Sequence, residues 1–316
     1  MKTLICVGEC MIELSETGQT VSGPGGASLM ARTFGGDTLN TAVYAARALA
    51  GNGQVGYATG LGDDPFSDEM LAAWQAEGLS TDLVLRFPGR LPGLYAIKTD
   101  GAGERSFHYW RVNAPARDMF KHPEQDNWAE ALGRADMLYF SGISLAILDE
   151  DGREGLLAIA EAVREAGGHT AFDTNHRPAL WPDTETAKSW MERAFRACTI
   201  GLPSLEDAGA LGFGSQPAAV AETCKSFGVE EIVVKDGAGP SLVAVPGQPD
   251  VLVDGQSVDR PTDTTAAGDS FNGAYLAHRL MGEDPVSAAA QGRAMAAWVV
   301  SHRGAIVPPK PAENPN

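Results

Sequence analysis

Short apolar runs alternate with segments of helical periodicity through the middle and C-terminal parts of the chain. Residues 137–140 form such a run, and apolar positions between 156 and 163 then recur every three or four residues, until Gly167 and Gly168 end the pattern. The same pattern predicts strands at residues 1–9, 170–173, 198–202 and 231–235 and a helix at 217–227. Strands that alternate with helices are typical of parallel βαβ units. We therefore predict an α/β fold, with a mostly parallel central sheet that carries helices on both faces.

Two segments depart from this alternation. Residues 11–34 are rich in Gly, Ser and Thr, and residues 94–110 read as a β-hairpin whose turn lies at 100–103. Alternation along the hairpin places five side chains on related faces: Tyr95, Ile97, Arg105, Phe107 and Tyr109. We expect a small β-sheet lid made of residues 11–34 and about 88–112, inserted into a single domain of residues 1–310. Residues 311–316 are expected to be a disordered tail.

The chain of 316 residues is acidic, with 24 Lys and Arg against 41 Asp and Glu and a net charge of −17. Such a field repels polyanions, which argues against nucleic acid and anionic membranes as partners. It leaves room for a small anionic ligand, because a few arginines can invert the potential inside a cleft. No apolar run reaches 18 residues and the N-terminal run is too short for a signal peptide, so we expect a cytoplasmic protein. The four cysteines form no Cys-x-x-Cys pair, which favours free thiols over a zinc site.

The strongest chemical signal lies at residues 263–273. Three small residues precede the acid Asp269 and a plausible helix: Ala266, Ala267 and Gly268. Such a helix start presents backbone N–H groups where positive charge gathers, and this suits a phosphate or the charge that develops on one. A carboxylate held beside it can take a proton from an attacking alcohol. The alternative is an ordinary helix start that is capped by Asp263 or Thr264.

A second polar cluster precedes a helix predicted at residues 41–50. Its members are Gly35, Gly36, Asp37, Thr38 and Asn40. The glycines allow close approach of the backbone to a ligand, and the side chains offer oxygens and an amide that suit sugar hydroxyls. The alternative is a capped helix start with Asp37 or Thr38 as the cap.

Polar side chains also follow predicted strands, at the sheet edge where α/β proteins bind ligands. Tyr109 and Arg111 share a strand face and suit a carboxylate, although an ordinary cross-strand aromatic with a surface arginine is the alternative. Arg177 follows the strand at 170–173. Loops after two further strands contribute Ser204, Glu206, Lys235, Asp236, Gly237 and Gly239. These loops can flank a nucleotide, and Glu206 can organise water around Mg²⁺, although a helix-start acid and a hairpin turn are simpler explanations.

Together these residues resemble the ribokinase-like carbohydrate kinases of the PfkB family, over nearly the whole chain. Gly35-Gly36 with Asn40 resembles the N-terminal signature of that family, and residues 263–269 resemble its C-terminal signature. Two ordered signatures are far more specific than either one alone.

The resemblance implies ATP with Mg²⁺, Asp269 as the catalytic base, and a lid that often joins subunits into a homo-oligomer, a dimer or larger. It leaves a monovalent-cation requirement open. The chain departs from the family pattern at two places. Ala266 stands where the family commonly has Gly, at a limited cost unless φ is positive there. Ser204 stands where many members have Asn.

Within the family, residues 35–38, 109–111 and 175–177 resemble the kinases of 2-keto-3-deoxygluconate. That sugar acid carries a carboxylate, which a neutral sugar lacks, and its phosphorylation by ATP gives the 6-phosphate. The implied substrate contacts are Gly35, Gly36, Asp37, Thr38, Asn40, Tyr95, Tyr109, Arg111, Arg177 and Asp269. The implied ATP contacts are Asn175, Arg177, Ser204, Lys235, Asp236, Gly237, Gly239 and Gly268, with Glu206 as an indirect Mg²⁺ ligand.

Three other functions compete with this interpretation. A kinase of the same family acting on a neutral sugar such as fructose is the nearest. For a sugar-acid kinase, the sequence does not fix the stereochemistry of the acid, so a galactonate-derived substrate stays open. A non-catalytic sugar- or nucleotide-binding regulator is a second, which the intact Asp269 opposes. A dinucleotide-dependent dehydrogenase is the third, and the segment 60–66 argues against it because Pro65 breaks the G-x-G-x-x-G pattern.

Overall fold

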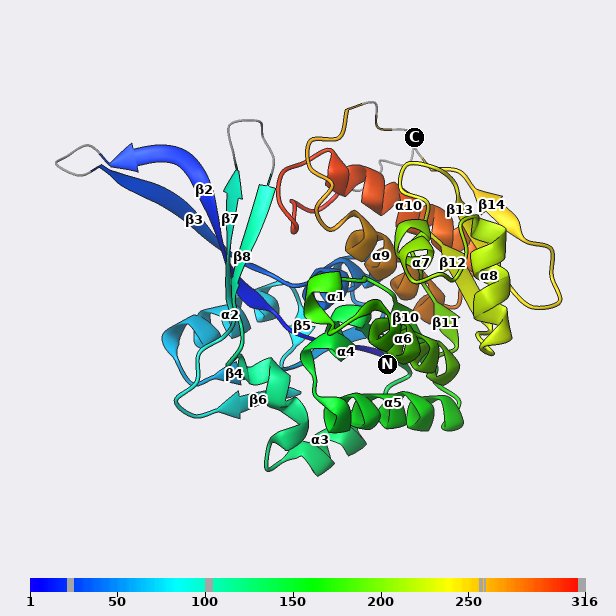
Figure 1. Cartoon of the computed structure of the whole chain (residues 1–316), viewed down its shortest axis with the longest axis horizontal. Helices are drawn as coiled ribbons and strands as arrows, with labels where there is room; N and C mark the ends of the chain where they lie inside the picture. Colours follow the sequence, from blue (N-terminus) through cyan, green and yellow to red (C-terminus); the bar gives the residue numbers. More distant parts are fainter. Residues whose placement is uncertain (22–25, 100–104, 256–257, 259, 312–316) are drawn as a thin grey trace.

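The computed structural model places two sheets and their helices in one chain (Figure 1). It describes residues 1–21, 26–99, 105–255, 258 and 260–311. The hairpin turn predicted at 100–103 and residues 312–316 of the predicted tail lie outside these ranges. Among the described residues, no helix combines the length and the apolar character needed to cross a bilayer.

The central sheet runs in the order β14-β13-β12-β11-β10-β9-β1-β4-β5, and β6 pairs with β4. Its pairs are parallel except for β12–β13 and β13–β14 at one edge. The strands are β1 (Thr3–Val7), β4 (Gln54–Gly62), β5 (Leu79–Ser80), β6 (Val84–Phe87), β9 (Met137–Ser141), β10 (His169–Asp173), β11 (Ile200–Gly201), β12 (Glu231–Val234), β13 (Ser241–Ala244) and β14 (Val251–Val253). The mostly parallel α/β sheet predicted from the sequence is thus confirmed.

Helices cover both faces of this sheet, because its strands present apolar residues to both sides. In β1, Leu4 and Cys6 belong to one hydrophobic core, and Ile5 and Val7 belong to the other. The first core is covered by α1 (Asp37–Leu49), α2 (Pro65–Ala76), α9 (Ala267–Met281) and α10 (Pro285–Val300). The second is covered by η1 (Pro115–Lys121), α3 (Gln125–Leu132), α4 (Gly142–Ile147), α5 (Glu150–Glu165), η2 (Pro178–Leu180), α6 (Thr184–Ala197), α7 (Leu205–Ala210) and α8 (Pro217–Ser226).

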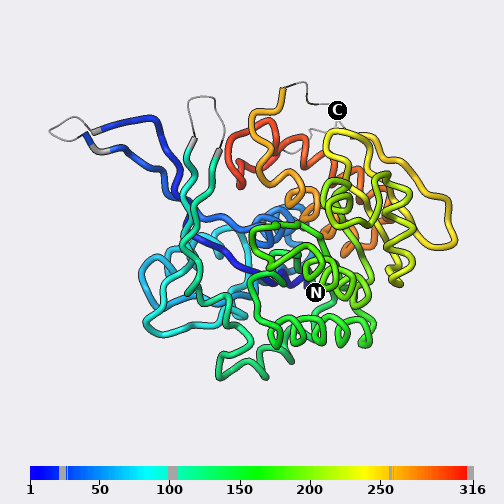
Figure 2. The backbone as a smooth tube through the Cα atoms, in the orientation of Figure 1, coloured from blue at the N-terminus to red at the C-terminus, as the bar shows by residue number. Residues whose placement is uncertain are grey.

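The second sheet has the order β3-β2-β7-β8. Its strands are β2 (Met11–Val21), β3 (Ala27–Gly35), β7 (Leu94–Thr99) and β8 (Arg105–Trp110). Figure 2 shows the two chain segments that form it lying side by side and projecting away from the helices. Arg32 on β3 pairs with Glu69 of α2 and lies over the ring of Phe66 at 4.9 Å, so this sheet is also tied to the helical layer.

Helix starts explain where the structure differs from the predicted boundaries. Four helices begin after an aspartate whose carboxylate accepts backbone N–H groups, namely Asp64, Asp149, Asp183 and Asp284. Helix α1 instead begins at Asp37, four residues before the predicted start, and its N-cap Gly36 makes no side-chain cap. The capping role considered for Asp37 or Thr38 is therefore wrong. The strand predicted at 198–202 is also shorter, because only Ile200–Gly201 pairs with its neighbours.

Candidate active site

A cavity of about 1300 Å³ opens at the carboxyl ends of the central strands, beneath the second sheet. Its walls come from the ends of β1, β8, β10 and β12 and from the starts of α1, α7 and α9. Such a location is typical of ligand sites in open α/β sheets. The cavity brings together the two polar clusters that the sequence separates by about 230 residues.

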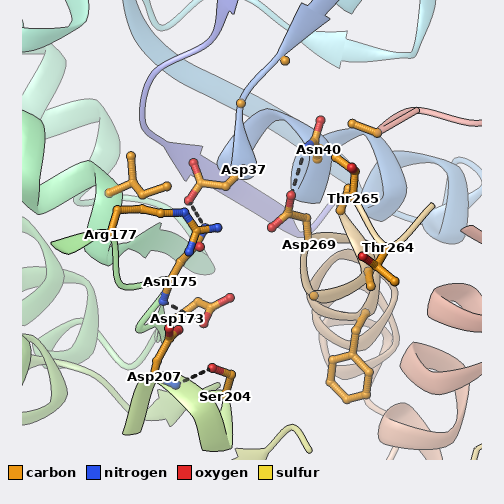
Figure 3. Close-up of a pocket in the computed structure, with 18 of the residues that line it drawn as sticks. Asp37, Asn40, Asp173, Asn175, Arg177, Ser204, Asp207, Thr264, Thr265 and Asp269 are labelled. Carbon is orange, nitrogen blue, oxygen red and sulfur yellow. Dashed lines mark hydrogen bonds between the residues drawn. The ribbon is translucent and has the colours of Figure 1, made fainter. Parts of the chain in front are cut away.

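Asp269 lies in the first turn of α9 and faces this cavity (Figure 3). Its Oδ2 accepts a hydrogen bond from Asn40 Nδ2 at 2.9 Å, and its backbone carbonyl accepts one from Thr41 Oγ1 at 3.2 Å. Both donors lie on α1, which packs against α9, and Gly273 allows this close approach because a Cβ there would lie 2.5 Å from the Thr41 carbonyl oxygen. Packing of two helices therefore fixes the orientation of the carboxylate.

The start of α9 presents backbone donors beside that carboxylate. The first intrahelical bond runs from Ser270 N to Ala266 O at 2.8 Å, so the N–H groups of Gly268 and Asp269 have no acceptor within the helix. The Ala267 N–H donates to Thr264 O at 3.2 Å, so it is already engaged. Of the three predicted anion-hole amides, Ala266 and Gly268 are the ones the helix leaves available.

Ala266 adopts the left-handed conformation that Gly tolerates best. It is the N-cap of α9, with φ of 59° and ψ of 17°, and it caps no N–H with its side chain. The alternative capping roles of Asp263 and Thr264 are therefore wrong. Asp263 instead accepts bonds from Thr265 N at 3.0 Å and from Gly304 N at 3.1 Å, which hold the preceding loop.

Replacing Ala266 with Gly is expected to stabilise the protein. A left-handed L-residue costs about 1–2 kcal/mol, which exceeds the roughly 0.4–1 kcal/mol of extra unfolded-chain entropy that Gly brings. Urea denaturation should therefore show a gain of about 0.5–1 kcal/mol in the free energy of unfolding. Ala267→Gly is the matched control, since Ala267 is the first residue of α9 and has helical backbone, so Gly there adds unfolded-chain entropy without relieving strain and should lower stability. A lower stability for Ala266→Gly would contradict this account of the loop.

Asp37 lies opposite Asp269 and is held by two donors (Figure 3). Ser141 Oγ donates to its Oδ2 at 2.5 Å, and Asn175 Nδ2 donates to the same atom at 2.8 Å. The close backbone turn before it requires Gly36, since a Cβ there would collide with the Glu9 carbonyl oxygen. Burial raises the pKa of Asp37, and the hydrogen bonds from Ser141 and Asn175, together with the Arg177 charge, oppose this rise.

Lys235 supplies a cation next to the start of α9. Its Nζ donates to Asp173 Oδ2 at 2.8 Å and to Asn272 Oδ1 at 3.1 Å. The same atom lies 3.7 Å from where a Cβ on Gly268 would be. Asn272 also donates to Asp173 Oδ2 at 2.6 Å, so a buried network aims the ammonium group at the helix start. This arrangement strengthens the attraction for a phosphate at that position.

The pKa of the Asp269 carboxyl is raised to about 7. Burial is the main cause, the Asp37 charge adds to the rise, and the hydrogen bond from Asn40 opposes it. Asp173 raises this pKa further and Lys235 lowers it. Because the charge of Asp37 raises the pKa of Asp269, these two carboxylates titrate as a linked pair.

This pKa predicts an acid limb in the pH profile of the reaction. A general base acts in its ionised form, so kcat/KM should fall about tenfold per pH unit below an apparent pKa of about 7. Replacing Asp37 with Asn removes one negative charge and should move this limb to lower pH, whatever it does to the maximum rate. Steady-state kinetics between pH 5 and 9 measure the acid limb of the wild type and that of Asp37→Asn. A wild-type profile that stays flat down to pH 5 would be inconsistent with Asp269 as the base.

The second sheet contributes aromatic and charged groups to the roof of the cavity. Tyr95 and Tyr109 are directly opposed across β7 and β8, with ring centroids 5.7 Å apart. The Tyr95 hydroxyl donates to Glu13 and fills the space next to Gly35, where a Cβ would collide with it. The pairing of Tyr95 with Tyr109 and of Ile97 with Phe107 confirms the shared face predicted for the hairpin.

Arg111 is buried rather than exposed, which excludes the surface-arginine alternative. It is 8% exposed and forms an ion pair with Glu9, which is 3% exposed and follows β1. Its guanidinium lies 5.6 Å from the centre of the Tyr109 ring. The Glu9 carboxyl has a raised pKa because of burial, although the Arg111 charge opposes the rise.

Most of the predicted site residues line this one cavity, and two do not. Thr38 is fully buried and its hydroxyl shares a hydrogen bond of 3.1 Å with Tyr57. Gly239 lies in the β12–β13 hairpin turn, where its N–H donates to Asp236 O at 2.7 Å. The cavity also contains residues that the sequence interpretation did not select: Glu9, Phe107, Arg117, Asp173, Asp207 and Arg293. Of these residues, only Asp173 could have been selected from the sequence, because it ends the strand predicted at 170–173, directly before a predicted ligand-binding loop.

Several of the residues predicted to contact ATP follow strands β11 and β12. Ser204 caps α7 by accepting from Asp207 N at 3.0 Å, which explains this side chain without a ligand. Glu206 is exposed at the cavity wall, and Asp207 accepts from Thr174 Oγ1 at 3.0 Å. Among the described residues there is no cluster of three or more His, Cys, Asp or Glu that would hold a metal by itself.

Known proteins resemble this chain over nearly its whole length. The pfkB family carbohydrate kinase model matches residues 1–313. A 2-dehydro-3-deoxygluconokinase of Dickeya dadantii is 42% identical, and one of Escherichia coli K12 is 44% identical, each over 97% of both chains. A 2-dehydro-3-deoxygluconokinase of Thermotoga maritima has a TM-score of 0.76 at 21% identity, covering 97% of this chain and 96% of that one. By family and by fold, the chain belongs to the pfkB family of carbohydrate kinases.

Proposed function

We propose that this protein transfers the γ-phosphoryl group of ATP to the terminal hydroxyl of 2-dehydro-3-deoxy-D-gluconate, giving ADP and the 6-phosphate. The observation that carries the proposal is the position of Asp269, a carboxylate oriented by Asn40 beside unengaged amides in a cavity rich in arginine. Relatives named for this activity at 42–44% identity support the choice of substrate, while the fructokinases that match are 29% identical.

Each part of the site has a place in this reaction. Asp269 accepts the proton of the terminal hydroxyl as that oxygen attacks phosphorus in line with the leaving ADP oxygen. The Ala266 and Gly268 amides and the Lys235 ammonium stabilise the charge on the transferring phosphoryl group. Asp37 and Asn40 bind sugar hydroxyls, and Tyr95, Tyr109, Arg111 and Arg177 bind the acid end. Closure of the second sheet over the site would exclude water, which limits hydrolysis of ATP.

The residues at the nucleotide side fit a Mg²⁺ ion that is held mostly by ATP. Mg²⁺ usually keeps several waters and binds through one or two carboxylates together with substrate phosphates. Glu206 and Asp207 line this part of the cavity and can accept hydrogen bonds from such waters. A putative ribokinase II of Escherichia coli with a TM-score of 0.80 binds ATP and Mg²⁺, which supports the same pair here. The ion would neutralise charge between the phosphates.

The second sheet is also the proposed contact between subunits in the cytoplasm. The sheet exposes several large apolar residues, namely Leu29, Met30, Phe107, Tyr109 and Trp110, and Val112 is exposed just after β8. Pairing this face with that of a second copy would remove them from water. Sedimentation of the purified protein would detect the dimer.

An ADP-release assay against a panel of substrates tests the proposed reaction. The panel contains 2-dehydro-3-deoxygluconate, its galactonate-derived epimer, fructose and ribose. The gluconate-derived acid should have a kcat/KM at least about 100-fold above that of either neutral sugar, because a site built for a charged group rejects analogues that lack it. Preference for fructose would assign the protein to a neutral-sugar branch of the family. Absence of ADP release with every compound would overturn kinase activity.

A further inference from the structure

Arg117 differs from the other cations that line the cavity, because their positive groups already have partners. Arg111 pairs with Glu9, Lys235 pairs with Asp173, Arg177 donates to the His176 carbonyl, and Arg293 donates to the carbonyls of Gly237 and Ala238. Within the described part of the chain, the Arg117 side chain makes no hydrogen bond or ion pair, although it is half-buried and lines the cavity. Of these five cavity cations, Arg117 is therefore the one whose side chain has no hydrogen bond or ion pair with the described residues.

The local structure holds Arg117 at this wall. It lies in η1, which begins with Pro115, and its N–H donates to Ala114 O at 3.1 Å. The neighbours Ala116 and Met119 are buried in the core under the sheet. Pro115 packs against β4 so closely that a Cβ on Gly60 would lie 2.8 Å from the Pro115 carbonyl oxygen. A fixed backbone reduces the entropy that binding would otherwise remove.

The two helical layers place Arg117 across the cavity from Asp269. Asp269 lies on α9, which covers one core of the central sheet, whereas η1, which carries Arg117, covers the other core. The start of η1 is also joined to Arg111, because Ala114 N donates to Arg111 O at 3.1 Å, and the Arg117 charge lowers the pKa of Glu9, the partner of Arg111. A sugar acid whose terminal hydroxyl meets Asp269 directs its carboxylate, at the opposite end of its carbon chain, toward this region.

We propose that Arg117 is a specificity-determining residue that binds the carboxylate of the sugar-acid substrate. The inference rests on the proposed function. Glu9 neutralises Arg111, so Arg111 orients the carboxylate by hydrogen bonding, and Arg117 adds a positive charge, beside that of Arg177, that a neutral sugar does not need. A charged hydrogen bond of this kind changes binding by about 10- to 100-fold.

Kinetics of Arg117→Met and Arg117→Lys, with 2-dehydro-3-deoxygluconate and ATP, test this assignment. Methionine keeps the apolar stem and removes the charge, so KM for the sugar acid should rise about 10- to 100-fold, while kcat and the KM for ATP stay within about threefold. Lysine should recover most of the affinity, because the charge returns without the guanidinium geometry. Arg134→Met, at an exposed arginine of the chain, is the matched control and should behave as the wild type.

The outcomes separate this inference from the proposed function. A wild-type enzyme that uses the sugar acid, together with an Arg117→Met variant of unchanged KM, would overturn the role of Arg117 and leave the function standing. A parallel loss in the KM for ATP and in kcat would also overturn it, because it would indicate a general structural role. A wild-type enzyme that turns over fructose and no sugar acid would overturn the proposed function, and this inference with it.

Discussion

Replacing Asp269 with Asn is expected to lower kcat by about 10²- to 10⁴-fold, the usual contribution of a positioned general base. Asparagine has the same shape and can still accept from Asn40 Nδ2, so the geometry of the site should persist. Affinity for ATP should be no weaker, because a negative charge next to the phosphates has been removed. Turnover by ADP release and binding of ATP by calorimetry measure the two effects separately.

Stability measurements distinguish a loss of catalysis in Asp269→Asn from a loss of folded protein. The folded-state pKa of Asp269 is raised, so the native protein binds this proton more tightly than the unfolded chain does. Its contribution to stability is therefore present at low pH and is lost as the pH rises from about 4 toward about 7. At pH 8 the Asn variant should be at least as stable as the wild type. Asp126→Asn, at an exposed acid of α3, is the control for activity, and near-normal turnover of Asp269→Asn would exclude its role as the base.

Replacing Arg111 with Met should destabilise the protein by about 3–5 kcal/mol, the usual result of removing one partner of a buried ion pair. Both groups are almost fully buried, and Glu9 would be left without its counter-charge. Glu9 Oε1 and Arg111 Nε already lack hydrogen-bond partners among the described residues, so the intact pair is only partly satisfied. Urea denaturation measures the loss.

The double variant Glu9→Gln with Arg111→Met separates stability from substrate recognition. Removing both charges should recover most of the lost stability, since no unpaired charge remains. The KM for the sugar acid should stay raised, because the hydrogen-bonding arginine is still absent. Recovery of both stability and KM would show that Arg111 serves the fold alone, and failure to recover stability would contradict the ion-pair account.

The two signatures could be found in the sequence because each is a local pattern with a local cause. Residues 263–269 and 35–40 both span the start of a helix, and the packing of these helices, α9 and α1, brings them together. The predicted start of α1, at residue 41, is four residues later than its true start at Asp37. Polar residues of its first turn, Asp37 and Asn40, reach into the cavity, so they interrupt the apolar pattern that marks a helix.

The partners of the site residues could not be found in this way, because they come from distant parts of the chain. Glu9 and Arg111 are 102 residues apart, and Asp173 and Asn272 are 99 residues apart. Neither pair leaves a periodic pattern, and each depends on which strands are neighbours in the folded sheet. Arg117 was missed because one arginine in an irregular segment looks like any surface charge until its surroundings are known.

The attachment of the second sheet has a mechanical consequence. Two ion pairs tie its base to the rest of the protein, Glu9 with Arg111 at one side and Glu69 with Arg32 at the other. If the sheet bends about a line through these two anchors, the strand tips would move through the widest arc and Arg111 would be barely displaced. Such bending would open and close the entrance to the cavity while the proposed acid-binding end of the site keeps its shape.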